Sequence, residues 1–213
     1  MWFLVKRQGD VALCAYNGRV LIDIPLLHEA RQRLALVDNL VIACELIAPP
    51  ESGRPRCHHV AAALFSNNGP DRLRSCAFDL VELGAEPQLN QTYGCRLQKI
   101  QQWLGNANLL SVVTTVQGSP ADALAYYREW VGSQGFDGIV VREGQSFGYK
   151  IKPAFSIDAV VVAFGSRIMT GSPQLREMSV AIRRNDGRLH IPGSVGPGFA
   201  EIDRAAWHES FRD

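Results

Sequence analysis

Apolar and polar residues follow one another in short blocks along the first part of the chain. Residues 11–20 have apolar positions on both sides of the Tyr-Asn-Gly triplet at 16–18, a pattern typical of a β-hairpin. Residues 40–47 form a nearly continuous apolar run before two prolines, which predicts a buried strand. Apolar residues recur at helical spacing between residues 25 and 36. The pattern therefore predicts strands separated by helices.

The pattern continues through the middle of the chain and changes after Gly165. There, short strand-like pieces are joined by an Asn-Asp-Gly turn at 185–187 and by a run rich in glycine and proline. Further helices are expected at 58–65, 96–104 and 120–134, and further strands at 75–83, 139–141, 160–162, 178–182 and 189–191. We therefore predict an α+β fold in which strands dominate, with a domain at 1–156 and a small β-rich domain at 157–213.

The composition is that of a soluble globular protein, with 213 residues of which 46% are apolar and 20% charged. The net charge of +1 excludes a global basic field for nucleic acid but leaves room for a local basic groove. No apolar run is long enough to span a membrane, and the apolar start at residues 1–5 is too short for a signal peptide. Five scattered cysteines without a C-x-x-C pair indicate reduced thiols. We therefore expect a cytoplasmic protein without membrane contacts.

One short segment, Cys-His-His at 57–59, raises the question of a metal site. Adjacent residues rarely bind one tetrahedral ion together, and no second ligand pair follows at zinc-finger spacing. We therefore do not expect zinc at this segment.

Two lysines, Lys150 and Lys152, lie two residues apart between β-branched runs that we interpret as buried strands. Side chains at i and i+2 of a strand project from the same face, so two ammonium groups there require an anion nearby. A phosphate group fits this requirement, and Asp137 at the start of the preceding strand can hold the divalent ion that phosphate sites usually contain. The alternative is an exposed edge strand with two solubilising lysines.

The segment FDGIVVREG…YKIKP…IDAVVVAF, residues 136–164, resembles the closing motifs of the ATP-dependent DNA ligase superfamily of covalent nucleotidyltransferases. Other segments resemble that family's motifs in the same order. VIACELIAP is similar to the strand with a metal- and ribose-facing glutamate, here Glu45, and CAFDLVEL to the segment whose aromatic residue stacks on adenine, here Phe78. VALCAYNGRVL resembles the family's Ser-Arg-Asn-Gly hairpin, and MSVAIRRNDGRLHIPGSVGPGF resembles the first strands of an OB-fold. The resemblance covers nearly the whole chain.

This resemblance implies a nucleotidyltransferase (adenylation) domain at 1–156 followed by a partial OB-fold β-barrel at 157–213. It implies an enzyme of DNA repair or recombination that uses ATP and Mg²⁺. Its substrate would be nicked duplex DNA, with RNA as the second possibility, and it would seal the nick through lysyl-AMP and AMP-DNA intermediates.

The resemblance also implies roles for individual residues. Lys150 and Lys152 would neutralise the charge that develops on phosphate oxygens during transfer. Glu45 and Asp137 would hold Mg²⁺, with Glu45 facing the ribose as well. Phe78 would stack on the base. From the residues alone, Phe78 can equally be a core aromatic and Glu45 a charge at a strand edge.

The nucleophile departs from the family's pattern. The family has Lys-x-Asp-Gly ahead of the hairpin, whereas Lys6 is followed by Arg-Gln-Gly. A gapless match of the hairpin places the family's lysine before Met1, and the OB-fold ends at Asp213 without the family's basic closing motif. Two hypotheses stay open. One is a ligase-type enzyme that uses Lys6 or an upstream segment; the other is a degenerate or split module that binds nucleotide or nucleic-acid ends, with a partner supplying the missing motifs.

Three arginines, Arg183, Arg184 and Arg188, flank the turn at 185–187. They can contact the phosphates of a nucleic acid, or they can solubilise the tip of a hairpin. The sequence supports both interpretations equally.

Overall fold

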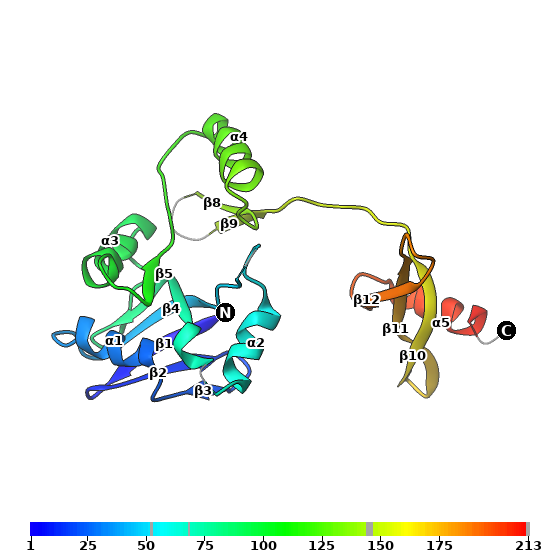
Figure 1. Ribbon diagram of the computed structural model, residues 1–213, viewed down its shortest axis with the longest axis horizontal. Coiled ribbons are helices and arrows are strands. Elements are labelled where there is room, and N and C mark those ends of the chain that lie inside the picture. The colour runs from blue at the N-terminus through cyan, green and yellow to red at the C-terminus, as the bar shows by residue number, and fades with distance from the viewer. Residues whose placement is uncertain (52, 68, 144–146, 212–213) are drawn as a thin grey trace. The chain divides into compact units, whose positions relative to one another are not determined.

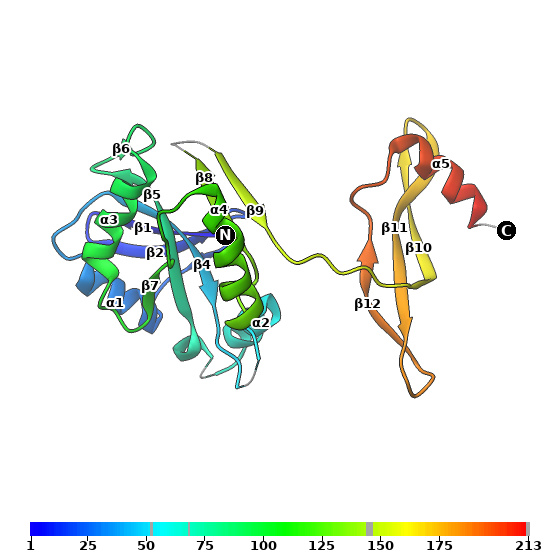
Figure 2. The ribbon, with the colours of Figure 1, turned by 90° about the horizontal axis from the view of Figure 1, so that it is seen from above.

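The computed structural model describes every residue except 52, 68, 144–146 and 212–213. It divides into two compact units, Met1–Pro153 and Ala154–Asp213 (Figures 1 and 2). The sequence placed this boundary after residue 156. Helices and strands are mixed throughout, which confirms the α+β class. No described helix is long and apolar enough to cross a membrane.

Seven strands form the main sheet of the first unit, in the order β3-β2-β1-β4-β5-β6, with β7 paired to β5 (Figure 1). All pairs are antiparallel except that of β5 with β7. The strands are β1 (Trp2–Arg7), β2 (Asp10–Ala15), β3 (Val20–Leu21), β4 (Leu40–Ile47), β5 (Arg74–Leu83), β6 (Glu86–Pro87) and β7 (Leu110–Val112). The hydrophobic pattern predicted the hairpin, β4 and β5. It missed β1, β6 and β7, of which β6 and β7 are too short to show a clear period.

One face of this sheet carries the core of the unit. Helices α1 (Pro25–Arg33) and α3 (Tyr93–Leu104) contribute buried leucine, isoleucine and alanine side chains to the same hydrophobic cluster as the sheet. Fully burying one such large apolar side chain contributes about 1.5–3 kcal/mol, so this face supplies most of the stability of the unit. The buried sheet residues include Leu4, Leu13, Leu40, Ile42, Ala77 and Leu80.

The opposite face of the main sheet is more open. In β4, the residues at even positions from 40 to 46 are buried. Of the odd positions, Ala43 is also buried, Val41 and Ile47 are half-buried and Glu45 is exposed. Because side chains alternate along a strand, the odd positions share the face away from the core cluster. This face is the less buried of the two, and it carries the exposed side chain of Glu45.

A hairpin and the helix before it form a smaller part of the first unit (Figures 1 and 2). Strands β8 (Ile139–Glu143) and β9 (Phe147–Ile151) pair as an antiparallel two-stranded sheet, which we call the β8–β9 hairpin. A helix precedes it, in which α4 (Pro120–Tyr127) continues into the π-helical turn η2 (Arg128–Ser133). The sequence predicted one helix over 120–134, which the structure confirms. The remaining elements are α2 (Cys57–Phe65) and the 3₁₀ turn η1 (Pro70–Arg72).

The second unit is a three-stranded antiparallel sheet with one helix. Its elements are β10 (Val160–Met169), β11 (Ser172–Arg183), β12 (Leu189–Val195) and α5 (Glu201–Ser210), with the strands in sequence order. Arg204 of α5 donates to three backbone carbonyls, those of Leu175, Arg176 and Gly196, at 2.7–3.0 Å. The strands described here do not close into a barrel.

One expectation for this region is wrong, and one helix was not predicted. The run 160–162 was interpreted as a buried strand, but Val160, Val161 and Val162 are 57%, 39% and 40% exposed. Its β-branched composition identified a strand correctly without telling which faces are covered. Helix α5 was not predicted, because its charged and apolar residues follow directly on a segment rich in glycine and proline.

The cysteines give a direct test of this burial pattern. All five are free thiols, with Cys57 and Cys95 exposed and Cys44 buried in β4. Burial raises the pKa of Cys44 to about 11, and only the thiolate is nucleophilic. We expect iodoacetamide at pH 8 to modify Cys57 and Cys95 while leaving Cys44 unmodified, as measured by peptide mass mapping. Labelling of Cys44 at the rate of Cys57 would contradict the burial of β4.

Candidate functional site

Glu45 is an exposed acidic residue on the open face of the main sheet. Its side chain is 60% exposed, and its carboxylate lies 3.4 Å from the amino group of Met1. Its strand neighbours Cys44 and Leu46 are buried on the core side, which fixes the direction of Glu45 toward the open face. The carboxylate is therefore open to solvent on the side away from Met1.

Phe78 occupies a β-bulge in β5. Ala43 pairs with Asp79 and Cys44 pairs with Ala77, so Phe78 is an extra residue without a partner in β4. Its side chain is half-buried and is not part of the buried core cluster. Of the two interpretations that the sequence left open, the structure therefore places Phe78 outside the main core.

The bulge is held by the first turn of α3. The hydroxyl of Tyr93 donates to the backbone carbonyl of Phe78 at 3.0 Å. Arg96 makes a bidentate contact with the carboxylate of Asp79, at 2.7 Å from Nε and 3.1 Å from Nη2. A bulge has fewer ladder hydrogen bonds than a regular strand, so these side-chain contacts fix its backbone.

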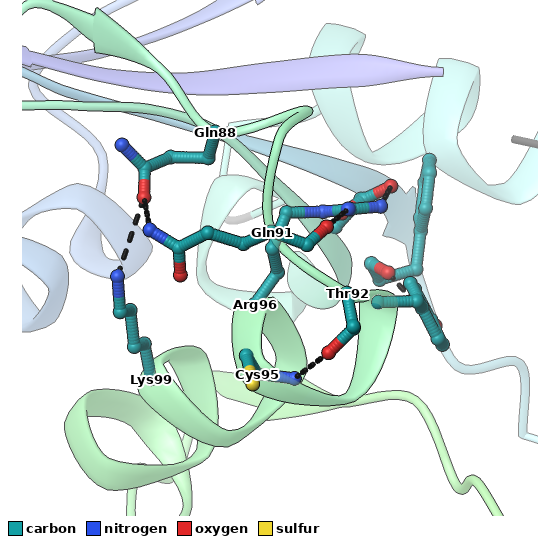
Figure 3. Close-up of polar contacts among 9 residues, drawn as sticks. Gln88, Gln91, Thr92, Cys95, Arg96 and Lys99 are labelled. Carbon is teal, nitrogen blue, oxygen red and sulfur yellow. Dashed lines mark hydrogen bonds and ion pairs between the residues drawn. The ribbon is translucent and has the colours of Figure 1, made fainter. Parts of the chain in front are cut away.

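Figure 3 shows how this turn of α3 is itself supported. Arg96 also donates through Nη1 to the carbonyl of Gln91 at 2.5 Å. Thr92 caps the helix by accepting from the backbone N–H of Cys95 at 3.4 Å. Lys99 and the Gln91 amide both donate to Oε1 of Gln88, at 3.2 and 2.7 Å. Sequence reasoning missed Tyr93 and Arg96; their i, i+3 spacing just after the Phe-Asp segment was the available signal.

The β8–β9 hairpin presents Lys150 on a defined face. Lys150 pairs with Val140, and Val140 and Arg142 project from the same face because they are two residues apart. A Cβ placed on Gly148 would meet the side chains of Val140 and Arg142, at 3.2 and 3.5 Å, which identifies the same face independently. Val140, Arg142 and Lys150 are all exposed, so the run 139–141 is not the buried strand that the sequence predicted, although Ile139 is buried. This face is therefore open.

Lys152 lies just beyond the end of β9 and opposite Gly138. A Cβ at Gly138 would come within 2.4 Å of the Ile151 carbonyl and 2.8 Å of Lys152 Cγ. Only glycine leaves room for that close approach, which gives a physical reason for the Asp-Gly pair at 137–138. Lys152 is exposed and sits beside the residue that follows Asp137.

Asp137 has two arginine neighbours that sequence reasoning missed. Its Oδ1 lies 3.6 Å from Nη1 of Arg56 and 4.0 Å from Nη1 of Arg54, on the loop before α2. All three side chains are partly exposed, so these ion pairs are weak and exchangeable. A divalent cation at Asp137 would have to replace these two contacts.

The structure does not bring Lys6 together with Glu45. Lys6 pairs with Leu40, so the two project from the core face, opposite to that of Glu45. Its side chain is only 3% exposed. Its ammonium group donates to the carbonyl of Leu34 at 2.7 Å and lies 3.4 Å from Asp38. Leu34 ends α1, so Lys6 places positive charge at the negative end of that helix dipole.

A substitution tests this structural role of Lys6. Lys6→Met keeps the length of the side chain but leaves the buried Leu34 carbonyl without its charged donor. We expect the free energy of unfolding to fall by about 1–3 kcal/mol, measured by urea denaturation. The matched control is Arg31→Met, an exposed position on α1 where the change should stay within about 0.5 kcal/mol. Equal stability of the two variants would contradict the capping role.

The remaining predicted residues lie in the second unit. Arg183, Arg184 and Arg188 are exposed around the turn between β11 and β12, and Arg184 Nε lies 3.8 Å from Asp186. This carboxylate offsets part of their charge. Both interpretations of these arginines stay open.

Among the described residues, there is no group of three or more His, Cys, Asp or Glu side chains that could hold a metal ion alone. Mg²⁺ is commonly held by one or two carboxylates together with substrate phosphates and water. Glu45 and Asp137 supply the oxygen donors that Mg²⁺ prefers, and each is exposed. The residues therefore fit an ion that arrives with a phosphate substrate.

Comparison with known proteins supports the resemblance at low identity. No family model matches the chain. It is 26% identical over 218 residues to DNA ligase C1 of Mycolicibacterium smegmatis, and 23% identical over 234 residues to a DNA ligase of Methanococcus maripaludis. These matches cover 94% and 93% of the chain, but 62% and 40% of the relatives. The chain therefore spans less than two thirds of the curated relatives that it matches.

Solved structures lead to the same group of proteins. The ligase domain of M. tuberculosis LigD matches 98% of the chain and 68% of its own length, with 26% identity and a TM-score of 0.55. A Lig E DNA ligase matches 96% of the chain and 80% of its own length, with 21% identity and a TM-score of 0.59. A structure named Pmar-Lig_PreS3 reaches a TM-score of 0.72 over 99% of the chain and 53% of its own length, at 16% identity. The last two likenesses concern the fold alone.

Proposed function

The chain is related to the ATP-dependent DNA ligase superfamily, and we propose that its first unit binds ATP with Mg²⁺ as a ligase-type nucleotidyltransferase domain. One observation carries the proposal. Lys150 shares a face of the β8–β9 hairpin with Arg142, whose guanidinium lies over the ring of Tyr93, and Tyr93 holds the Phe78 bulge. The side chain of Tyr93 thus contacts the backbone of Phe78, proposed for the base, and Arg142, which lies beside Lys150, proposed for the phosphates.

The base and ribose end would lie on the open face of the main sheet. Phe78 lies outside the core and can stack on adenine, since an aromatic side chain buries a large apolar area. Glu45 is exposed on the neighbouring strand and can accept hydrogen bonds from ribose hydroxyls or bind the metal ion. These assignments rest on the resemblance and on the accessibility of both side chains.

The phosphate end would lie against the β8–β9 hairpin. Lys150 and Lys152 would neutralise charge on the α-phosphate oxygens as AMP is transferred, a role that lysine fulfils as a mobile point charge. Asp137 and Glu45 would hold Mg²⁺, which supplies further positive charge at the phosphate oxygens. In the full reaction a lysine would attack the α-phosphate of ATP and expel pyrophosphate. The AMP would then pass to the 5′-phosphate of a nick in DNA, and it would leave when the 3′-hydroxyl attacks that phosphate. The arginines of the β11–β12 turn would contact the nucleic acid.

A second candidate function is supported by the position of Lys6. A buried lysine whose ammonium group already binds the Leu34 carbonyl is poorly placed to attack a phosphate. In this second function, the chain binds nucleotide or nucleic-acid ends without adenylylating itself. A partner would then supply the missing motifs.

Intact-mass measurement after incubation with ATP and Mg²⁺ separates the two functions. The sequence contains four lysines, so a gain of one AMP can be mapped by proteolysis to Lys6, Lys99, Lys150 or Lys152. A gain that disappears in Lys6→Ala would make Lys6 the nucleophile in spite of its burial. ATP binding without a mass gain would favour the second function. Absence of ATP binding would contradict the first function and the nucleotide-binding form of the second.

A further inference from the structure

Tyr93 contacts both halves of the proposed nucleotide site. Its hydroxyl donates to the backbone carbonyl of Phe78 in the main sheet, at 3.0 Å. Its ring lies beneath the guanidinium of Arg142 in β8, 4.5 Å from the ring centroid. The two contacts reach different sheets, since β5 and β8 belong to separate sheets of the first unit.

The contact with Arg142 has the geometry of a favourable cation–π interaction. Such a contact contributes most when the cation is within about 6 Å of the ring centroid and partly desolvated. Arg96 adds a second guanidinium at 5.7 Å from the same centroid. Tyr93 is half-buried, and burial raises the pKa of its phenol, so it stays a neutral hydrogen-bond donor at physiological pH.

Tyr93 links the residues proposed to bind the base with those proposed to bind the phosphates. Phe78 is the bulge residue whose carbonyl Tyr93 holds, and its neighbour Asp79 is fixed by Arg96. At the other end, Arg142 and Lys150 project from the same face of the hairpin. The base and the phosphates of a nucleoside triphosphate must be bound at a fixed separation. Tyr93 lies between Phe78, proposed for the base, and the strand pair that carries Lys150, proposed for the phosphates.

We propose that Tyr93 is a positioning residue that sets the Phe78 strand and the Lys150 hairpin at the separation required by a nucleoside triphosphate. This inference rests on the proposed function, because it requires that Phe78 and Lys150 bind the same ligand. Tyr93 need not touch the nucleotide. It acts through the backbone of Phe78 and through Arg142.

The experiment measures the affinity for ATP with Mg²⁺ by isothermal titration calorimetry in a series of variants. Tyr93→Phe keeps the ring and its contact with Arg142 but removes the hydrogen bond to the Phe78 carbonyl, so its loss of ATP affinity should be smaller than that of Tyr93→Leu. Tyr93→Leu removes both contacts and should weaken ATP binding by at least about tenfold. Arg142→Gln, at an exposed position, should reproduce most of that loss without altering the core.

A double variant distinguishes coupling from general damage. If Tyr93 and Arg142 act as one link, Tyr93→Leu combined with Arg142→Gln should bind ATP within about threefold of Tyr93→Leu alone. Adenosine tests the base side separately: its affinity should change less than that of ATP in both single variants, because it does not engage Lys150. Arg128→Gln, an exposed arginine on η2, serves as the matched control and should leave ATP affinity unchanged.

The outcomes separate this inference from the proposed function. Absence of ATP binding by the unmodified protein would overturn the proposed function and the inference with it. ATP binding that Arg142→Gln leaves unchanged would overturn the inference alone. Equal losses for adenosine and ATP would also overturn it, because they would indicate damage at Phe78. Circular dichroism of each variant shows whether Tyr93→Leu folds; if it does not, Arg142→Gln decides.

Discussion

Replacing Arg96 with leucine is expected to lower the free energy of unfolding by about 3–5 kcal/mol. The guanidinium is 1% exposed and forms a bidentate pair with Asp79, besides its bond to the Gln91 carbonyl. The substitution leaves the largely buried carboxylate of Asp79 without its counter-charge. The free-energy cost of that unpaired charge is larger than the net stabilisation by the ion pair. Chemical denaturation followed by circular dichroism measures the loss.

Two further variants show whether the unpaired carboxylate is the cause. Asp79→Leu combined with Arg96→Leu removes both charges, so the double variant should be more stable than Arg96→Leu alone. Lys99→Leu, on the same helix, removes only a 3.2 Å contact with Gln88 and should cost less than about 1 kcal/mol. A double variant as unstable as the single one would indicate that lost packing, and not the orphaned charge, dominates.

Replacing Lys150 or Lys152 with alanine is the change with the largest expected effect on the ligand. Each lysine that binds a phosphate oxygen makes a charge-assisted hydrogen bond worth about 1.5–3 kcal/mol, which corresponds to an affinity loss of about tenfold to a hundredfold. Both side chains are exposed, so neither substitution should destabilise the fold. Calorimetric titration with ATP and Mg²⁺ measures the effect.

Adenosine is the control ligand for the titrations of the Lys150 and Lys152 variants. Adenosine has no phosphate, so its affinity should be the same in the lysine variants and in the unmodified protein. Arg128→Ala removes one exposed positive charge elsewhere in the unit and should not alter ATP binding. Unchanged ATP affinity in both lysine variants would make the two residues the solubilising pair that the sequence allowed as an alternative.

The local pattern of apolar and polar residues was sufficient to predict most of the helices and strands. The apolar run of β4, the helical spacing of α1 and the hairpin of β2 and β3 lie where the sequence placed them. These features depend on residues close in the chain, so a short window contains the information. The order of the motifs likewise identified the ligase superfamily without any knowledge of the fold.

The sequence did not show which residues are buried or which face of each strand is covered. Lys6 lies among apolar residues of β1, and only the pairing of β1 with β4 and the end of α1 shows that its ammonium group is buried at Leu34. The valines at 160–162 look like a core strand but are exposed. Which face of a strand is covered depends on elements remote in sequence.

The sequence by itself determined the α+β class and most elements, and its family resemblance predicts that Glu45, Phe78, Asp137, Lys150 and Lys152 bind a nucleotide. Only the tertiary structure decided that Tyr93 and Arg96 hold the Phe78 bulge, and that Arg142 joins the hairpin to Tyr93. It also placed Arg54 and Arg56 beside Asp137. These contacts link segments far apart in the chain, and a periodic pattern contains information about neighbours within one element only.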